Sequence, residues 1–151
     1  MRAINHALTG AIIGLTVAQP VVALPLALAS HFVLDALPHY GPKADGNNWI
    51  RSNAFKYMLY IDAILCFAVV LILFVNNPVN WLLAVSCAFL AAAPDLISFR
   101  RYKKTLGHKK WRPNTYEKFA TKIQWFERPI GAVVEVVWLI AAIAILTPFL
   151  G

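Results

Sequence analysis

Residues 55–75, FKYMLYIDAILCFAVVLILFV, decide the class of fold. A helix needs roughly 20 predominantly apolar residues to cross a bilayer, and this stretch supplies them with only Lys56 and Asp62 charged. The 151-residue chain is 60% hydrophobic and 14% charged, whereas soluble domains are about 45 to 50% apolar and about 25% charged. The sequence therefore predicts an all-α integral membrane protein.

Four further stretches complete a predicted polytopic bundle of about five transmembrane helices. They are residues 3–18, 20–37, 79–99 and 129–150, and the Gln19-Pro20 pair turns the chain between the first two. The first two spans are short, so they would be tilted or partly re-entrant. Residues 1–151 form a single membrane domain in this interpretation, because no internal repeat, low-complexity tract or linker divides the chain.

The cations orient the predicted bundle, because Lys and Arg accumulate in cytoplasmic loops. All 14 cations lie before the first span, around the start of the third, or in a basic loop at 100–128. The opposite connections and the C-terminus carry none, so we expect the N-terminus inside and the C-terminus outside. A cleaved signal peptide is the competing interpretation of the first thirty residues, but His6 inside the apolar stretch argues against it.

This topology gathers seven titratable groups from all five spans into the inner leaflet. Ionisable side chains at membrane depth are costly and usually functional. With no Lys or Arg among them, the group would be strongly anionic unless a cation occupied it. We therefore expect a site for one or two divalent metal ions, with zinc first and manganese or iron as alternatives. The seven residues are His6, His31, Asp35, His39, Asp62, Asp95 and Glu135.

Spacing separates these residues into roles. His31 and Asp35 are one helical turn apart and could chelate one ion. His39 lies about 12 Å along the axis from His31 in a continuous helix, but Pro38 should end or bend the helix. His39 could then fold back, bind a second ion, or support a ligand through a hydrogen bond. The predicted metal ligands are His6, His31, Asp35, His39 and Asp95.

The remaining carboxylates, Glu135 and Asp62, are the predicted catalytic residues, one of which would act as general base. Several of the seven also have ordinary interpretations. His6 and His39 could be solvated at an interface. Asp95 could cap a helix end after Pro94, and Asp62 could neutralise Lys56 or Arg51.

Three short motifs resemble those of the YdjM-like (LexA-binding, inner-membrane-associated) family of membrane-bound metal-dependent hydrolases. They are Asn5-His6-Ala7-Leu8-Thr9-Gly10, the segment from Ser30-His31 through Asp35 to Tyr40-Gly41, and Pro94-Asp95. The resemblance implies a metal-dependent hydrolase, with His6, His31, Asp35 and Asp95 as the positions carried over. It places the protein in the cytoplasmic (inner) membrane of a bacterial or archaeal cell as a multi-pass protein.

A hydrolase with a site at the inner leaflet would act on an amphiphilic substrate, such as a phospholipid or a lipid-linked phosphate. A metal ion with an open position would activate a water and polarise an ester or phosphoryl oxygen. The basic loop would attract anionic headgroups. An amphipathic helix near 114–126, with Trp111 and Trp125, would lie on the membrane surface, while His108 would be solvated. The headgroup-binding candidates are Arg100, Arg101, Lys103 and Lys104.

Two other functions stay open, namely a small transporter or ion-binding protein and a non-catalytic adaptor that uses the basic loop. The bare outer leaflet disfavours transport, and an adaptor leaves the buried carboxylates unexplained. Membrane lipids are the expected partners. The positive-inside rule already accounts for the basic charge of the loop, so the charge does not indicate that the protein binds nucleic acid. A homodimer is compatible with so small a bundle. Gly10 and Gly14 form a GxxxG pattern that would let the first helix pack closely on a neighbour.

Overall fold

The fold is all-helical, as the composition predicts. The computed structural model describes residues 1–41, 46–107 and 112–151, so the expectations for His108, for Trp111 and for Lys43, one of the cations before the third predicted span, lie outside the described residues. The described residues form no β-strand, and their β-type pairing is an isolated bridge between His39 and Glu127. The helices are α1 (Ala3–Val17), α2 (Pro20–Ala36), α3 (Gly46–Arg51), α4 (Asn53–Asn76), α5 (Trp81–Leu106), α6 (Thr115–Ile123), α7 (Gly131–Leu146) and the short 3₁₀ helix η1 (Thr147–Phe149).

The first two helices form a tight hairpin, as the Gln19-Pro20 pair predicts. Ala18 ends α1 in the left-handed conformation with φ of 55°, Gln19 is extended, and Pro20 opens α2. Proline suits the first position of a helix because its missing N–H would have no partner there. The helix α2 ends at Ala36, and Leu37 is extended with ψ of 158°. Pro38 accounts for that end, because proline disfavours helical backbone in the residue before it.

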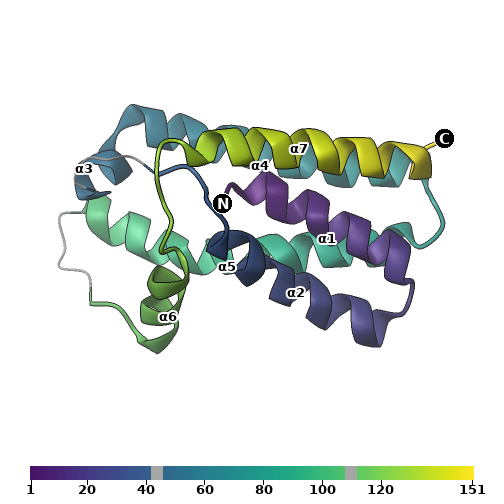
Figure 1. Ribbon diagram of the computed structural model, residues 1–151, viewed down its shortest axis with the longest axis horizontal. Helices are drawn as coiled ribbons and strands as arrows, with labels where there is room; N and C mark the ends of the chain where they lie inside the picture. The colour runs from purple at the N-terminus through teal and green to yellow at the C-terminus, as the bar shows by residue number, and fades with distance from the viewer. Residues whose placement is uncertain (42–45, 108–111) are drawn as a thin grey trace.

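Three segments of the described chain are long and apolar enough to cross a membrane, namely α4, α5 and α7 with η1. The helices α1 and α2 are apolar but shorter. The prediction of five spans with the N-terminus inside therefore stays a prediction. In Figure 1, α3 and α6 lie at one end of the bundle, and the α1–α2 turn, the α4–α5 turn and the C-terminus lie at the other. The last turns of α5, which carry Arg100, Arg101, Lys103 and Lys104, lie at the same end as α3 and α6, as the predicted topology requires.

Two predicted loops contain helix, and both are corrections. Residues 100–106, assigned to the basic loop, continue α5 to Leu106. Pro94 leaves α5 unbroken, because packing against neighbours can offset one missing backbone hydrogen bond. Lys103 and Lys104 near the C-terminus of α5 also complement the helix dipole. The stretch between the second and third predicted spans also contains helix, because α3 runs from Gly46 to Arg51.

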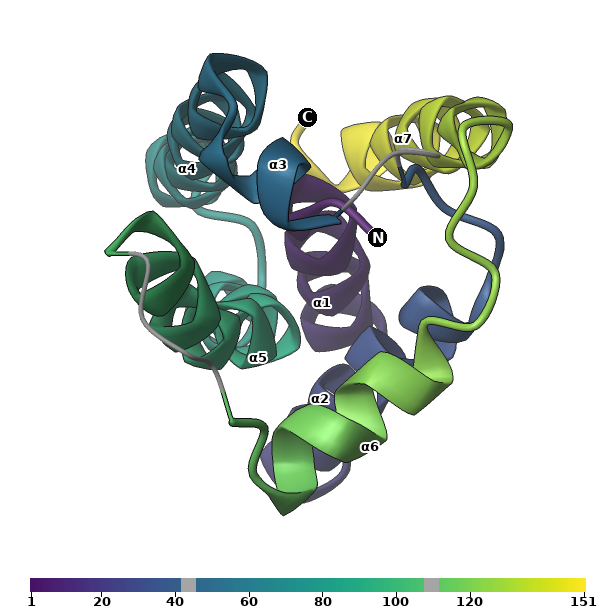
Figure 2. The ribbon, with the colours of Figure 1, turned by 90° about the vertical axis from the view of Figure 1, so that its left-hand side faces the viewer.

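The helix α1 is the centre of the bundle, where it packs on α2, α4, α5 and α7 (Figure 2). Its closest neighbour is α5. A Cβ atom at Gly10 would collide with the backbone of Cys87, and one at Gly14 would collide with the backbone of Ala84. The close packing predicted from the GxxxG pattern is therefore present, and it holds the middle and last turn of α1 against the first two turns of α5.

The amphipathic helix predicted near 114–126 is present as α6. Asn114 caps it by accepting a hydrogen bond from the backbone N–H of Glu117, whose side chain accepts one from the backbone N–H of Asn114. The helix packs on α2 through the Phe32 ring, which contacts Tyr116 and Phe119. It therefore lies beside the part of α2 that carries the predicted metal ligands.

Candidate metal centre

His6, His31 and Asp95 meet in the interior of the bundle. They come from α1, α2 and α5, and each offers one ligand atom, all within 4.8 Å of one another. Close packing of these three helices brings them together, because Gly10 on α1 permits the contact with α5 and the hairpin places α2 beside both. The cluster contains three of the five predicted metal ligands.

The hydrogen bond of His31 fixes which ring nitrogen can bind a cation. Its Nδ1 lies 2.9 Å from the backbone carbonyl oxygen of Ala91. A carbonyl oxygen can only accept, so Nδ1 carries a proton and donates it. Its Nε2 lies 3.3 Å from Oδ2 of Asp35. In a neutral ring with its proton on Nδ1, Nε2 carries a lone pair, which the Asp35 carboxylate would repel. A positive charge between Nε2 and Asp35, either a proton or a metal ion, removes that repulsion.

His6 is completely buried, with 0% of its surface exposed. Its ring stacks on that of His31 with the centroids 4.1 Å apart. Neither ring nitrogen has a hydrogen-bond partner within the described part of the chain. Its Nε2 lies 3.2 Å from Oδ1 of Asp35, which is ion-pair distance, whereas Nδ1 faces no polar partner among the residues that the structure describes. A buried polar atom left without a partner costs about 1 to 3 kcal/mol, and a bound cation would remove that cost.

Asp35 faces both histidines, one turn after His31 on α2. Its Oδ1 also contacts the amino group of Met1, and its Oδ2 accepts a hydrogen bond of 2.9 Å from the side-chain amide of Gln124. The predicted proximity of His31 and Asp35 is thus present. The geometry allows Asp35 either to bind an ion directly or to orient the two imidazoles.

Asp95 lies inside α5 directly after Pro94. Its Oδ2 is buried and has no hydrogen-bond partner among the described residues. The expected position about one turn from a helix end is wrong, because α5 continues to Leu106. A role as a helix cap is therefore excluded, and the carboxylate is directed into the bundle, within ligand distance of the two histidines.

His39 is buried away from this group, in the segment between α2 and α3. Its Nδ1 donates a hydrogen bond of 2.9 Å to the carbonyl oxygen of Leu37. Its backbone pairs with Phe126 and Arg128. Burial lowers the pKa of the His39 imidazole, which favours its neutral form. The structure therefore does not bring His39 to the cation cluster, and the histidine instead lies where the segment after α6 joins that after α2.

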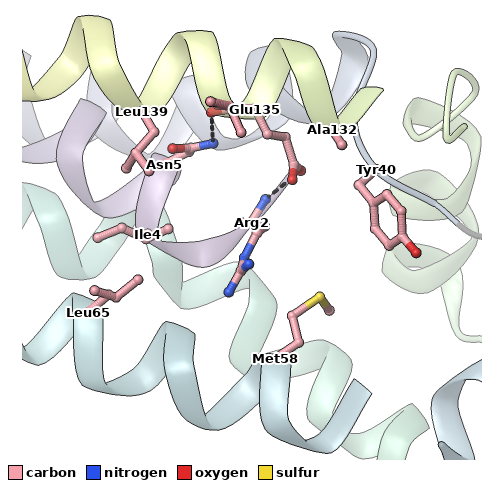
Figure 3. A pocket seen from close by; sticks show the side chains of 10 residues that line it. Arg2, Ile4, Asn5, Tyr40, Met58, Leu65, Ala132, Glu135 and Leu139 are labelled. Atoms are coloured by element: carbon pink, nitrogen blue, oxygen red, sulfur yellow. Dashed lines mark hydrogen bonds between the residues drawn. The ribbon is translucent and has the colours of Figure 1, made fainter. Parts of the chain in front are cut away.

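The two predicted catalytic carboxylates lie on the opposite side of α1, where both contact Arg2. The Nε of Arg2 donates a hydrogen bond of 3.0 Å to Oδ1 of Asp62, and its backbone N–H donates one of 3.1 Å to Oε1 of Glu135. Figure 3 shows Arg2 reaching from α1 toward α4 below Glu135. The side-chain amide of Asn5 donates to the backbone carbonyl of Glu135 at 3.2 Å. Neither carboxylate belongs to the group of residues that could share an ion.

Sequence reasoning missed Arg2, Asn5 and Gln124. The sequence identifies Arg2 only as a cation that orients the bundle, because nothing local distinguishes it from the other cations. Asn5 precedes His6 and would project from another face of a helix, which is a usable signal for a second site. Gln124 carries no local signal, because its partner Asp35 is far away in the sequence.

The predicted headgroup-binding residues lie in the last turns of α5. Arg100 and Lys103 are exposed, whereas Arg101 and Lys104 are half-buried. The ammonium group of Lys103 lies 5.8 Å from the centre of the Phe99 ring. These positions leave Arg100 and Lys103 accessible, and their role in lipid binding stays a prediction.

Comparisons with protein-family models, with curated proteins and with solved structures found no match to this chain.

Proposed function

We propose that this protein is a membrane-embedded, metal-dependent hydrolase that cleaves an ester or phosphoester bond of an amphiphilic substrate at the cytoplasmic leaflet. The observation that supports the proposal is the convergence of His6, His31 and Asp95 on a space where their ligand atoms lie within 4.8 Å of one another. Membership in the YdjM-like family, suggested by three short motifs, is part of the same proposal.

The residues present fit a divalent cation. Two imidazoles and a carboxylate are a common donor set for zinc, with manganese and iron as alternatives. His6 and Asp95 both carry buried polar atoms without a partner in the described residues. His31 is oriented by the Ala91 carbonyl, as metal-binding histidines usually are by a second hydrogen bond. His6, His31 and Asp95 would hold the ion, and Asp35 lies within reach as a further ligand.

The carboxylate suited to accept a proton is Asp35. Asp62 and Glu135 lie outside the group of residues that could share an ion, whereas Asp35 lies against the Nε2 atoms of the two histidines. A divalent ion bound there would supply a Lewis acid and an acidified water. Gln124 holds one oxygen of Asp35 in place, which leaves the other turned toward His6 and the Met1 amino group.

The surroundings of this cluster favour an amphiphilic substrate. Three described helices could cross a membrane, and exposed cations lie at the end of α5. A lipid with its polar head at the interface would meet both features.

Elemental analysis of the purified protein after incubation with zinc or manganese tests the metal centre. We expect stoichiometric metal in the parent protein and loss of at least about nine-tenths of it in His31→Ala and Asp95→Ala, because removing one ligand of a three-residue site weakens binding by several kcal/mol. His39→Ala is the matched control, since it removes a buried histidine that lies outside the cluster. Absence of metal from the parent protein, or equal loss in His39→Ala, would contradict the proposal.

Hydrolysis tests the catalytic part separately. Vesicles that contain phosphatidylglycerol and a fluorogenic phospholipid would report release of a fatty acid or a phosphorylated headgroup. We expect turnover that requires added metal, survives in His39→Ala and is lost in Asp35→Asn, His31→Ala and Asp95→Ala. Metal binding without any metal-dependent turnover would favour the alternative of an ion-binding or transport protein.

A further inference from the structure

A second feature of the interior is a cleft between α4 and α7. Both helices pack on α1, and direct contact between them is slight at most. The space left between them is a pocket of about 240 Å³. Figure 3 shows α7 above it, α4 below it and the start of α1 behind it.

The walls of the cleft become more apolar with depth. Met58 and Ala132 lie near the ends where α4 and α7 begin, and Leu65 and Leu139 lie two turns further along. Seven residues of helix span about 10 Å. The polar lining side chains, Arg2, Asn5, Tyr40 and Glu135, come from the start of α1, the segment after α2 and the first turns of α7. The cleft therefore joins a polar end to an apolar channel about 10 Å long.

Two polar atoms of this lining have no hydrogen-bond partner in the described chain. One is Nη2 of Arg2, a donor, and the other is Oδ1 of Asn5, an acceptor. Asn5 is 1% exposed, so water does not reach its oxygen freely. Buried polar groups are normally paired, which makes these two atoms a place for a ligand's acceptor and donor.

We propose that the cleft binds one acyl chain of a glycerolipid, which enters from the bilayer between α4 and α7 with its ester and glycerol hydroxyl against Arg2 and Asn5. The apolar walls belong to helices long enough to cross the membrane, so the hydrocarbon would pass from bilayer to cleft without meeting water. An ester carbonyl accepts from Arg2, and a neighbouring hydroxyl donates to Asn5.

Charge favours an uncharged ester over a phosphate at this position. The guanidinium of Arg2 already faces Asp62, and the carboxylate of Glu135 lies beside the Arg2 backbone. The polar end therefore has no surplus positive charge to attract a dianion. Size argues against a helix from a second copy of the chain, because a helix with side chains is about 10 Å across and the pocket holds only about 240 Å³.

As the acyl subsite of an enzyme, the cleft rests on the hydrolase proposed above. Asn5 and His6 are consecutive residues of α1, one lining the cleft and the other facing the cation cluster. A lipid ester held by Asn5 and Arg2 would thus lie beside the turn of α1 that carries His6. Binding of the acyl chain does not require the metal, so the two proposals can fail independently.

Photolabelling of the protein in nanodiscs tests the cleft. The probe is a monoacylglycerol with a diazirine near the end of its chain, applied after removal of metal by EDTA. We expect label on the peptides that carry residues 58–65 and 132–139, competed by unlabelled monoacylglycerol. Leu139→Trp fills the cleft and should lower this label about tenfold. Ile140→Trp is the matched control, because Ile140 is 63% exposed and faces away.

Val136→Phe provides a second cleft-filling variant if Leu139→Trp fails to fold, since Val136 also lines the pocket. Label that is spread over all exposed apolar faces, or that is unaffected by competition and by both variants, would overturn the proposal. Cross-linking of α4 or α7 to a second chain at the cleft would also overturn it. Specific label in a protein that binds no metal would support the cleft and refute the metal-dependent hydrolase. Metal-dependent turnover without specific label would support the hydrolase and refute the cleft.

Discussion

Two buried carboxylates on opposite sides of α1, Asp62 and Asp95, differ in what neutralises them. Asp62 accepts a hydrogen bond from Nε of Arg2 at 3.0 Å. Asp95 has a buried oxygen without a partner in the described residues and faces two histidines instead. A carboxylate with its own arginine is a structural ion pair, whereas Asp95 has no arginine or lysine of its own within the described ranges, and the Met1 amino group on this side of α1 is paired with Asp35, which leaves Asp95 suited to an external cation. Depth in the membrane alone does not separate these two roles.

The largest expected effect is that of a substitution in α1, the helix that separates the cation cluster from the cleft. Gly10→Val should lower the free energy of unfolding by more than about 3 kcal/mol, because its side chain would collide with the backbone of Cys87, which cannot move as a side chain can. Both the cation cluster and the cleft should be lost together. Thermal unfolding in detergent, followed by circular dichroism, measures the change.

Gly151→Ala is the control for that variant, since a Cβ there meets no atom within 4 Å. Unchanged stability of Gly10→Val would show that α1 and α5 are not in close contact. The common dependence of the two regions on α1 would then be wrong.

Arg2→Gln should have an intermediate effect that is confined to one side of α1. The change leaves Asp62 without its cation, at a cost of about 1 to 2 kcal/mol, since the Arg2 side chain is 31% exposed and water partly screens the pair. The double variant Arg2→Gln with Asp62→Asn should recover most of that stability. Bound metal, measured by elemental analysis, should stay at the parent level in both variants. Loss of metal in Arg2→Gln would show that the two regions form one site.

Gln124→Ala should have the smallest effect, on the cation side alone. It removes the 2.9 Å hydrogen bond to Asp35, which should cost about 1 kcal/mol of stability and weaken metal binding about tenfold. Isothermal titration of zinc into the metal-free protein measures the affinity. Gln19→Ala, at an exposed helix cap whose side chain makes no capping hydrogen bond, is the matched control. Equal zinc affinities in the two variants would show that Gln124 does not contribute to the metal site.

Much of the fold is determined by local patterns in the sequence. The apolar stretch at 55–75 predicts α4, Pro20 and Pro38 set the limits of α2, and Asn114 marks the start of α6. These predictions succeed because a helix needs only its own backbone hydrogen bonds, its caps and an apolar surface. The end of α5 was missed because a run of cations is compatible with either a loop or an exposed helix, and the sequence alone gives no preference.

The choice among the seven candidate residues was decided by the tertiary structure. The sequence by itself determined that histidines and carboxylates lie in apolar helices, where each needs a partner. It could not show that Asp62 and Glu135 meet Arg2, that His39 pairs with the segment after α6, or that Asp95 meets the two histidines. Those partners depend on how each helix is rotated and how closely it packs. Rotation and packing are set by contacts such as that of Gly10 with Cys87, which join residues far apart in the chain.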